Sequence, residues 1–208
     1  MNILLIGVQG SGKGTQAKLL SKKLNLPHIS SGELFRAHID NKTELGIIAD
    51  SFINRGHLVA DEYVYDMVEA ELKKYPNGFI LDGFPRTVPQ EKFLMEHYKI
   101  DYVFWLELDD DESFRRISSR FHCSKCDSDY NLLYKKPVKA GICDSCGGKL
   151  IQRRDDTPEY ILKRLEKFHQ KTRNVFMKSD GSYLLKEIDA SRSIEEIHQQ
   201  IINCIKDN

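Results

Sequence analysis

The glycine-rich stretch GVQGSGKGTQ, at residues 7–16, constrains the fold of this chain more than any other segment. It follows an apolar run at residues 3–6 that is typical of a buried β-strand, and it leads into a helix-like segment at residues 15–24. Four glycines in ten residues would make a poor hydrophobic core. At a strand–helix junction, however, glycines let consecutive backbone N–H groups surround phosphate oxygens, and the helix N-terminus adds partial positive charge. The stretch therefore predicts a phosphate-binding loop.

The spacing within this loop is Gly7-x4-Gly12-Lys13-Gly14-Thr15. Lys13 is expected to reach the β and γ oxygens of a nucleotide. The strict signature has a hydroxyl directly after the lysine, whereas here Gly14 takes that place and the hydroxyl follows at Thr15. The alternative, a plain glycine-rich turn, requires the strand context, the lysine and the hydroxyl to coincide by accident. Because a phosphate loop alone does not separate a kinase from a GTPase, an ATPase or a motor, the other motifs must decide.

The rest of the chain alternates short apolar runs with longer amphipathic segments, which predicts a parallel sheet with helices on both faces. Strands buried on both faces are predicted at residues 3–6, 79–81, 102–106 and 183–185, with a weaker candidate at 27–29. Helices are predicted at residues 15–24, 62–74, 89–97, 111–120, 158–177 and 193–205. The pattern indicates an α/β protein with a parallel sheet core flanked by helices.

Two regions interrupt this alternation. Residues 121–152 show no helical period and hold four of the five cysteines. That is too long for a plain connection inside a compact domain, so the region predicts a small inserted domain. Residues 30–61 are polar and helix-like without a convincing strand, and we interpret them as a second insert.

Composition excludes some classes of protein. The 208 residues carry no formal net charge and are 40% hydrophobic, an ordinary globular balance that argues against a bulk binder of nucleic acid or of anionic membranes. No apolar run approaches the roughly 20 residues that span a bilayer. The apolar N-terminal stretch is short and lacks a preceding positive region, so it does not resemble a signal peptide. We expect a cytoplasmic protein without a membrane or nucleic-acid partner.

The four clustered cysteines have the spacing of a two-knuckle zinc site: Cys123-x2-Cys126, sixteen intervening residues, then Cys143-x2-Cys146. Four thiolates close the coordination shell, so the expected zinc ion is structural, with one per chain. Paired disulfides and a free surface dithiol are the alternatives, and the cytoplasmic expectation disfavours disulfides. Cys204 is most simply a packing residue in the last helix.

The zinc insert also raises the rival interpretation of a nucleic-acid-binding ribbon. Its basic face would consist of Lys135, Lys136, Lys139 and Lys149. That face has only Tyr130 and Tyr134 as aromatic residues to interleave with the lysines, and the chain as a whole is neutral. A cover over a bound nucleotide is therefore the better interpretation of the insert.

A second motif, ILDGFPRT at residues 80–87, lies at the carboxyl end of a predicted strand, the edge of an α/β sheet that faces its ligands. Asp82 can hold a magnesium-bound water near the phosphates, although a carboxylate that caps the next turn is the alternative. Gly83 and Pro85 form a rigid turn that presents Arg86, whose guanidinium suits a phosphate. Arg36, after SSGELFR, is a second candidate for the same phosphate; alone, each arginine would be read as a surface residue.

Taken together, the motifs GSGKGTQ, SSGELFR, DGFPRT and QRRDD resemble the adenylate kinase family, in its long bacterial type with a zinc-binding lid. The match runs in order over nearly the whole chain. The resemblance implies a P-loop core (residues 1–29, 62–120 and 153–208), a nucleoside monophosphate (NMP)-binding insert (30–61) and a zinc-binding lid (121–152). It also implies a monomer that catalyses MgATP + AMP ⇌ 2 ADP, with magnesium as the catalytic ion.

The resemblance assigns roles to individual residues. Lys13, Arg86, Arg120, Arg153 and Arg164 would act on the transferring phosphoryl group. Asp155 and Asp156 would orient the lid arginines, and Gln90 would read the adenine of AMP. The expected ATP-binding residues are Gly10, Ser11, Gly12, Lys13, Gly14, Thr15, Arg116 and Arg120, with Arg116 beside the adenine. The expected AMP-binding residues are Ser31, Arg36, Arg86, Gln90, Arg153 and Arg164.

Four positions depart from the family pattern without removing a phosphate ligand: Gln9, Ala60, Ser119 and Asn131. They bear on rate and fine specificity more than on reaction type. A kinase for another monophosphate (UMP, CMP or GMP) remains the close alternative, since it would differ only in the base pocket. A nucleotide-binding structural protein without turnover is the third interpretation, and it would leave the lid arginines idle.

Overall fold

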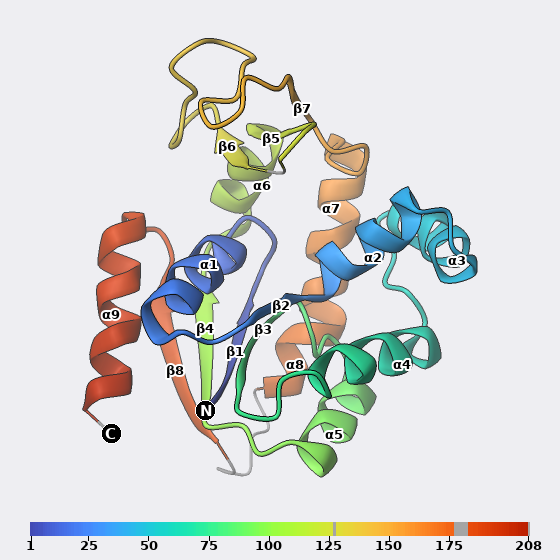
Figure 1. The fold of residues 1–208 in the computed structure, drawn as a ribbon, viewed down its shortest axis with the longest axis vertical. Coiled ribbons are helices and arrows are strands. Elements are labelled where there is room, and N and C mark those ends of the chain that lie inside the picture. Colours follow the sequence, from blue (N-terminus) through green and yellow to red (C-terminus); the bar gives the residue numbers. More distant parts are fainter. Residues whose placement is uncertain (127, 177–182, 208) are drawn as a thin grey trace.

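The computed structural model describes residues 1–126, 128–176 and 183–207, and its centre is a five-stranded sheet in the order β2-β3-β1-β4-β8 (Figure 1). All four neighbouring pairs are parallel. The strands are β1 (Asn2–Gly7), β2 (His28–Ser30), β3 (Phe79–Asp82), β4 (Tyr102–Glu107) and β8 (Leu184–Asp189). The predicted parallel α/β core is confirmed, including the weak strand candidate, which forms one edge of the sheet.

Burial separates the central strands from the edge strand β8. The interior residues of β1, β3 and β4 are fully or almost fully buried, as expected for strands covered on both faces. In β8 only Ile188 is buried, so the prediction of burial on both faces is wrong for this strand. The reason is its position, because an edge strand has a neighbour on one side only. The strand also starts one residue later than predicted and extends four residues further.

Helices line both sides of the sheet. In Figure 1, α1 and α9 lie to one side, and α5, α7 and α8 to the other. Side-chain caps fix several starts: Thr87 caps α5, Thr157 caps α7 and Ser193 forms a capping box with Glu196 on α9. The core helices are α1 (Lys13–Leu24), α4 (Asp61–Leu72), α5 (Val88–His97), α6 (Asp110–Ser118), α7 (Pro158–Lys167), α8 (Arg173–Phe176) and α9 (Ile194–Lys206).

Two helix predictions need correction. The helix predicted at residues 158–177 is interrupted by a π-helical turn, Phe168–Thr172, whose first and last residues are buried. Met177, its predicted end, lies outside the described residues. The helix predicted to reach Arg120 ends at Ser118, because Arg120 already pairs with Asn131 as the first residue of a strand.

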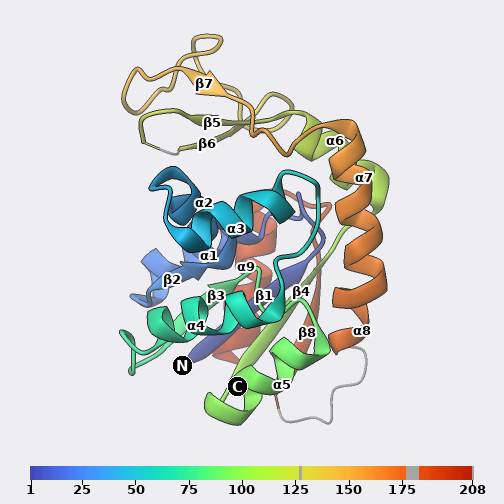
Figure 2. The same ribbon diagram turned by 90° about the vertical axis from the view of Figure 1, so that its right-hand side faces the viewer.

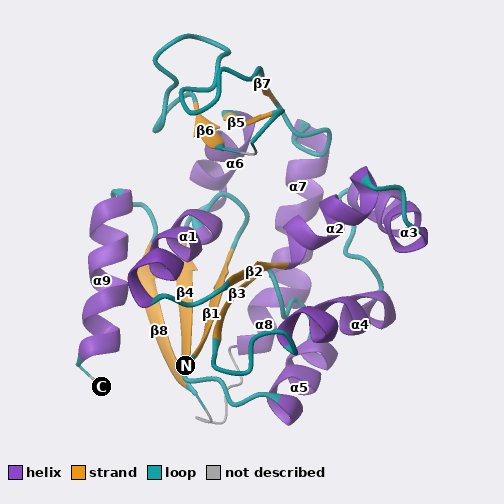
Figure 3. Ribbon diagram, viewed as in Figure 1, coloured by secondary structure: helices purple, strands orange, loops and turns teal. Residues whose placement is uncertain are grey.

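The two predicted inserts have different structures. Between β2 and α4 the chain forms the helices α2 (Ser31–Asp40) and α3 (Glu44–Ile53). Between α6 and α7 it forms a small antiparallel sheet in the order β6-β5-β7, set among long loops (Figure 3). Its strands are β5 (Arg120–Cys123), β6 (Asp129–Asn131) and β7 (Leu150–Ile151). Figure 2 shows this sheet above α2 and the start of α1, over the carboxyl edge of the large sheet.

Candidate active site

The phosphate loop connects β1 to α1, and glycine determines its shape. Gly10 and Gly12 have φ angles of +79° and +92°, which side chains disfavour. At Gly7, a Cβ atom would lie 2.5 Å from the carbonyl oxygen of Leu106 on the neighbouring strand β4. Gly12 is the N-cap of α1 and provides no side-chain cap, so the N–H groups of the first turn remain available to an anion. The buried hydroxyl of Ser11 also has no hydrogen-bond partner in the described chain.

Lys13 folds back over this loop. Its Nζ donates to the carbonyl oxygens of Gly7, at 2.8 Å, and Val8, at 2.9 Å. Burial lowers the pKa of Lys13 to about 8; the carboxylate of Asp82 opposes this shift, and nearby arginine charges add to it. Two neutral carbonyls compensate an ammonium less well than charged oxygens do. The environment of Lys13 therefore favours an arriving phosphate.

Asp82 ends β3 directly beside the phosphate loop. A Cβ atom on Gly14 would lie 3.5 Å from Asp82 Oδ2, and the Nε2 of His28 on β2 is 3.8 Å from the same oxygen. Burial raises the pKa of Asp82, but His28 and the ammonium of Lys13 outweigh burial, so the net shift is downward. The carboxylate is thus held ionised next to the expected position of the phosphates, where it can bind a hydrated cation.

The segment after β3 turns around Gly83 and brings two predicted AMP residues together. The hydroxyl of Ser31 donates to the carbonyl oxygen of Gly83 at 2.7 Å, and Arg86 Nε donates to the same oxygen at 2.6 Å. Burial lowers the pKa of Arg86; Asp82 opposes this, and the charges of Arg164 and Arg36 reinforce it. Arg86 is therefore close enough to Arg36 and Arg164 to be affected by their positive charges, and a bound anion would offset this repulsion.

Gln90 is 2% exposed and forms part of a hydrogen-bond network. Its Oε1 accepts from the backbone N–H of Arg86 at 2.8 Å, and its Nε2 donates to Asp61 Oδ1 at 2.6 Å. A carboxamide offers two N–H groups and two lone pairs, so half of its capacity has no partner among the described residues. Gln90 is already held by the protein, but it retains one donor and one acceptor for a ligand.

Two carboxylates on the segment between β7 and α7 hold the lid arginines. Arg120 makes a two-point contact with Asp156, at 2.9 and 2.6 Å. Arg164 donates to Asp155 Oδ2 at 2.8 Å and to Asp156 Oδ1 at 2.9 Å. The side chain of Asp156 is fully buried, and its pKa is lowered because the two arginines outweigh the effect of burial. The predicted orienting carboxylates are thus in contact with the predicted arginines.

The two remaining arginines lie at the edges of this cluster. Arg153 Nη2 is 3.6 Å from Asp129 Oδ1; burial lowers its pKa to about 10, with Arg120 and Arg36 adding to the shift. Arg116 on α6 is paired with Glu112 at 2.8 Å and stacks on the ring of Tyr134 in the insert. Its Nη1 also lies 3.5 Å from the carbonyl oxygen of Gly10, next to the phosphate loop.

The four cysteines predicted to bind zinc form a compact cluster. Their sulfur atoms all lie within 4.8 Å of one another, and none is in a disulfide. Tetrahedral thiolates at a zinc–sulfur distance of ~2.3 Å would be about 3.8 Å apart, close to the observed 3.6 Å between Cys126 and Cys143. At Gly148, a Cβ atom would lie only 2.6 Å from Cys123 Sγ. The donor set and the glycine that makes room for it both fit a structural zinc ion.

Comparisons with known proteins agree with this geometry. The sequence profile described as "Adenylate kinase" matches residues 5–179. This chain belongs to the adenylate kinase family. It is 41% identical to the adenylate kinase of Lachnoclostridium phytofermentans, over 99% of this chain and 98% of that protein. The adenylate kinase of Clostridium tetani is 40% identical with the same coverage, and that of Caldicellulosiruptor bescii is 45% identical over 83% of each chain. As a member of this family, the chain is a phosphotransferase of the P-loop type.

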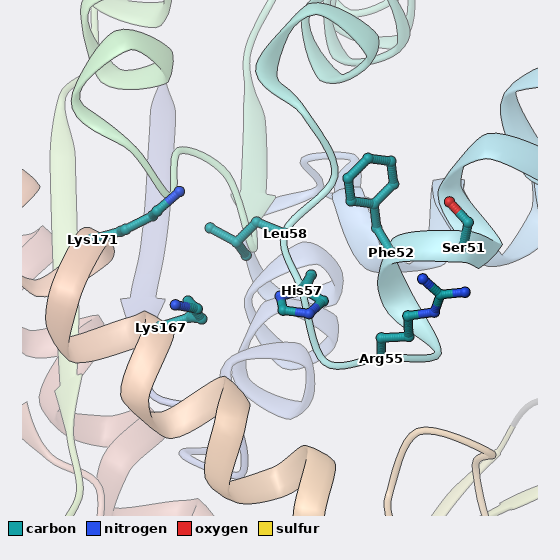
Figure 4. Close-up of a pocket in the computed structure, with 7 residues that line it drawn as sticks. All are labelled: Ser51, Phe52, Arg55, His57, Leu58, Lys167 and Lys171. Atoms are coloured by element: carbon teal, nitrogen blue, oxygen red, sulfur yellow. The ribbon is translucent and has the colours of Figure 1, made fainter.

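A cavity of about 450 Å³ lies away from the phosphate loop of this adenylate kinase family member (Figure 4). It is bounded by the end of α3, the following loop and the π-helical turn. Its lining residues are Ser51, Phe52, Arg55, His57, Leu58, Lys167 and Lys171. None of them is a predicted site residue. The loop amides and arginines of the predicted phosphate site thus lie outside this cavity.

Sequence reasoning missed three residues at or beside the site: His28, Asp61 and Lys18. His28 adjoins Asp82 only because β2 pairs with β3, and Asp61 reaches Gln90 only because α4 packs beside α5. Lys18 on α1 donates to Asp129 in the insert at 2.8 Å and lies 3.6 Å from Glu33 on α2. All these contacts join segments distant in sequence, so no local sequence pattern predicts them.

Among the described helices, none is long and apolar enough to cross a bilayer.

Proposed function

We propose that this protein transfers the terminal phosphoryl group of MgATP to AMP, giving two ADP. One observation carries the proposal. A glycine loop with Lys13 and a separate group of arginines meet at the same edge of the parallel sheet. Binding of a single nucleotide needs only the glycine loop and Lys13, whereas transfer between two nucleotides also needs the group of arginines. The resemblance of the relatives, each named adenylate kinase, supports the same reaction.

Phosphoryl transfer requires positioning and charge rather than a covalent intermediate. Lys13 and the amides of Gly10, Ser11, Gly12, Gly14 and Thr15 would hold the ATP phosphates, and Arg116 would lie beside its adenine. Ser31, Arg36, Arg86 and Gln90 would hold AMP. Arg120, Arg153 and Arg164 would surround the transferring group, with Asp155 and Asp156 fixing their orientation. An arginine supplied at the transition state is worth ~10³ to 10⁵ in rate in related chemistry.

Two metal ions belong to this proposal. Magnesium, when bound with ATP, neutralises charge on the β and γ oxygens, and the ionised Asp82 would hold one of its water ligands. Zinc would be held by Cys123, Cys126, Cys143 and Cys146, one ion per chain, in a purely structural role. The metal-ligating residues of the insert are remote in sequence from Lys13 and Asp82, so the two ions would serve separate purposes.

The domain boundaries expected from the sequence also belong here. Residues 30–61 would form the NMP-binding insert and residues 121–152 the lid, on a core of residues 1–29, 62–120 and 153–208. Arg120 and Arg153 flank the lid, so lid closure would bring both to the phosphates and expel the water that would otherwise hydrolyse ATP. We propose a cytoplasmic monomer, with ATP, AMP and ADP as its small-molecule partners.

Product formation with four acceptors tests the function. Nucleoside diphosphate is measured from MgATP with AMP, UMP, CMP or GMP in parallel, beside a control with ATP alone. We expect strong preference for AMP and almost no ADP in the control. Preference for another monophosphate would keep the mechanism and overturn the base assignment. Absence of transfer to every acceptor, despite tight binding of ATP, would refute the proposed reaction.

A further inference from the structure

Asp61 lies in the first turn of a helix, but its side chain contacts the start of a different helix. It is the first residue of α4, where a carboxylate commonly favours the helix N-terminus. Its side chain instead crosses to the start of α5. There Oδ2 accepts from the hydroxyl of Thr87 at 3.0 Å, and Oδ1 accepts from Gln90 Nε2 at 2.6 Å. Asp61 therefore contacts both the N-cap residue of α5 and the side chain proposed to read the base.

The orientation of the Gln90 carboxamide follows from the chemistry of its two partners. The backbone N–H of Arg86 can only donate, and it meets Oε1 at 2.8 Å. The carboxylate of Asp61 can only accept, and it meets Nε2. Exchanging Oε1 and Nε2 would set donor against donor on one side and acceptor against acceptor on the other. Since the side chain is 2% exposed, water would not relieve that mismatch.

We propose that Asp61 is a positioning residue for base selection, and that it acts by fixing which way round Gln90 presents its amide. This inference rests on the proposed function, in which Gln90 faces the base of the acceptor nucleotide. With the orientation fixed, Gln90 offers one N–H and one carbonyl lone pair. Adenine provides an acceptor at N1 and a donor at its 6-amino group, whereas a 6-oxopurine has a donor at N1 and an acceptor at O6. A flipped amide would suit the 6-oxopurine, and Asp61 opposes the flip.

Inosine monophosphate (IMP) is the sharpest probe, because it differs from AMP only in this reversed donor–acceptor edge. The measurement is kcat/KM for AMP and for IMP at saturating MgATP. In Asp61→Ala, the backbone N–H of Arg86 still favours the native orientation. A water takes the place of the carboxylate, however, and because water donates as readily as it accepts, one of the two constraints on the amide is lost. We expect the AMP:IMP ratio to fall by about tenfold, the size of one buried hydrogen-bond preference, mainly through the KM for AMP. The KM for ATP should not change.

Two further variants separate positioning from simple stability. Asp61→Asn can keep its amide oxygen toward Gln90 and its amide nitrogen toward Thr87, whose hydroxyl also accepts, so the ratio should recover to within about threefold of wild type. Glu62→Gln removes a charge from the same helical turn at an exposed position, and it should leave the ratio unchanged. Thermal unfolding of all variants checks that each one folds.

Dissociation constants for AMP and IMP give the same ratio without turnover. If wild type binds both nucleotides but makes no ADP, the proposed reaction fails while the ratio still tests Asp61. An AMP:IMP ratio that is the same in wild type and Asp61→Ala would overturn the inference, even if both affinities had fallen together. A ratio lowered equally by Glu62→Gln would also overturn it, since the effect would then belong to the charge of the helix start.

Discussion

The phosphate loop and the cysteine insert use glycine in the same way but obtain their rigidity from different sources. At Gly7 a side chain would collide with the Leu106 carbonyl, and at Gly148 it would collide with Cys123 Sγ. The phosphate loop directly follows β1, whose residues Leu4 and Leu5 are fully buried in the large core. Among its described residues, the insert has a separate core of four buried side chains: Cys123, Tyr130, Cys143 and Leu150.

Of the apolar residues around the small core of the insert, Phe121 packs against it while partly buried, and several others remain exposed. Val138 is 96% exposed, and Leu133 and Tyr134 are about half exposed. A region of this size buries too little apolar surface to offset the entropy of ordering its chain. Packing therefore holds the phosphate loop in shape, whereas the proposed binding of zinc by the four cysteines would supply the rigidity of the insert. Substitutions in the two regions should therefore separate activity from stability.

The largest expected effect is on activity, in Lys13→Met. Removing the ammonium should lower kcat/KM by about 10³-fold, in the range seen when one transition-state donor is lost. The unfolding temperature should stay within about 5 °C of wild type, because burial already disfavours this charge and the surrounding core is unchanged. Initial rates and calorimetry measure the two quantities.

The control for this variant is Lys22→Met, which removes an exposed lysine from the same helix. It should leave both quantities unchanged. If Lys13→Met instead unfolded the core and left the activity of the folded fraction intact, packing alone would not account for the shape of the phosphate loop.

Cys143→Ser should have the next largest effect, and mainly on stability. Losing one thiolate should release the metal, and a loss of ~4 kcal/mol would lower the unfolding temperature by about 10 °C in a domain of this size. The affinity of the core for ATP should change by less than about threefold, since the phosphate loop does not depend on the insert for its shape. Non-denaturing mass spectrometry, which should show one zinc in wild type, and calorimetry provide the readouts.

Cys204→Ser serves as the matched control, since Cys204 lies on α9 outside the cluster. It should retain the metal and the unfolding temperature. Metal-replete wild-type protein without zinc would refute the structural metal, and so would a Cys143→Ser variant that lost ATP affinity but no stability.

The smallest effect concerns pH. The pKa of Lys13 is lowered to about 8, and phosphate would raise it, so ATP binding should take up a proton near pH 8.5. Above pH 8 the affinity for ATP should fall by up to about tenfold per unit, as the free protein loses the ammonium. Calorimetric titration in two buffers of different ionisation enthalpy measures the uptake, and Lys13→Met should abolish it. Proton release at that pH in wild type would contradict the assignment.

The stability of the fold should respond to the same group in the opposite direction. The unfolded chain keeps the Lys13 proton up to about pH 10.5, whereas the folded chain loses it near pH 8. Since the unfolded state binds more protons in this window, the contribution of Lys13 to stability rises with pH while the affinity for ATP falls. Zinc binding should not weaken with rising pH, because its ligands bind as thiolates. As the pH rises, the affinity of the phosphate loop for ATP is therefore expected to fall, whereas the affinity of the insert for zinc is not.

The sequence determined the strand–loop–helix unit, the parallel sheet and the cysteine cluster, because each depends on local spacing. Gly7, Lys13 and Thr15 lie within nine residues of one another, and each cysteine pair forms within a single turn. The predictions failed where neighbours in space determined the structure. The strand β8 lies at an edge and is only partly buried, and the helix predicted at residues 158–177 is interrupted by a π-helical turn. There Thr172 is buried and donates to the carbonyl oxygen of Arg86, 86 residues away.

Several of the contacts that hold the predicted site residues come from long-range packing. The family resemblance implied that Gln90 reads a base, but the direction of its amide depends on the backbone N–H of Arg86 and on Asp61, which comes from another helix. The same applies to His28 beside Asp82 and to Lys18 beside Asp129. A sequence pattern specifies which chemical groups are present, since backbone geometry fixes local spacing. Long-range packing selects the partner of each group, and that partner sets its charge and orientation.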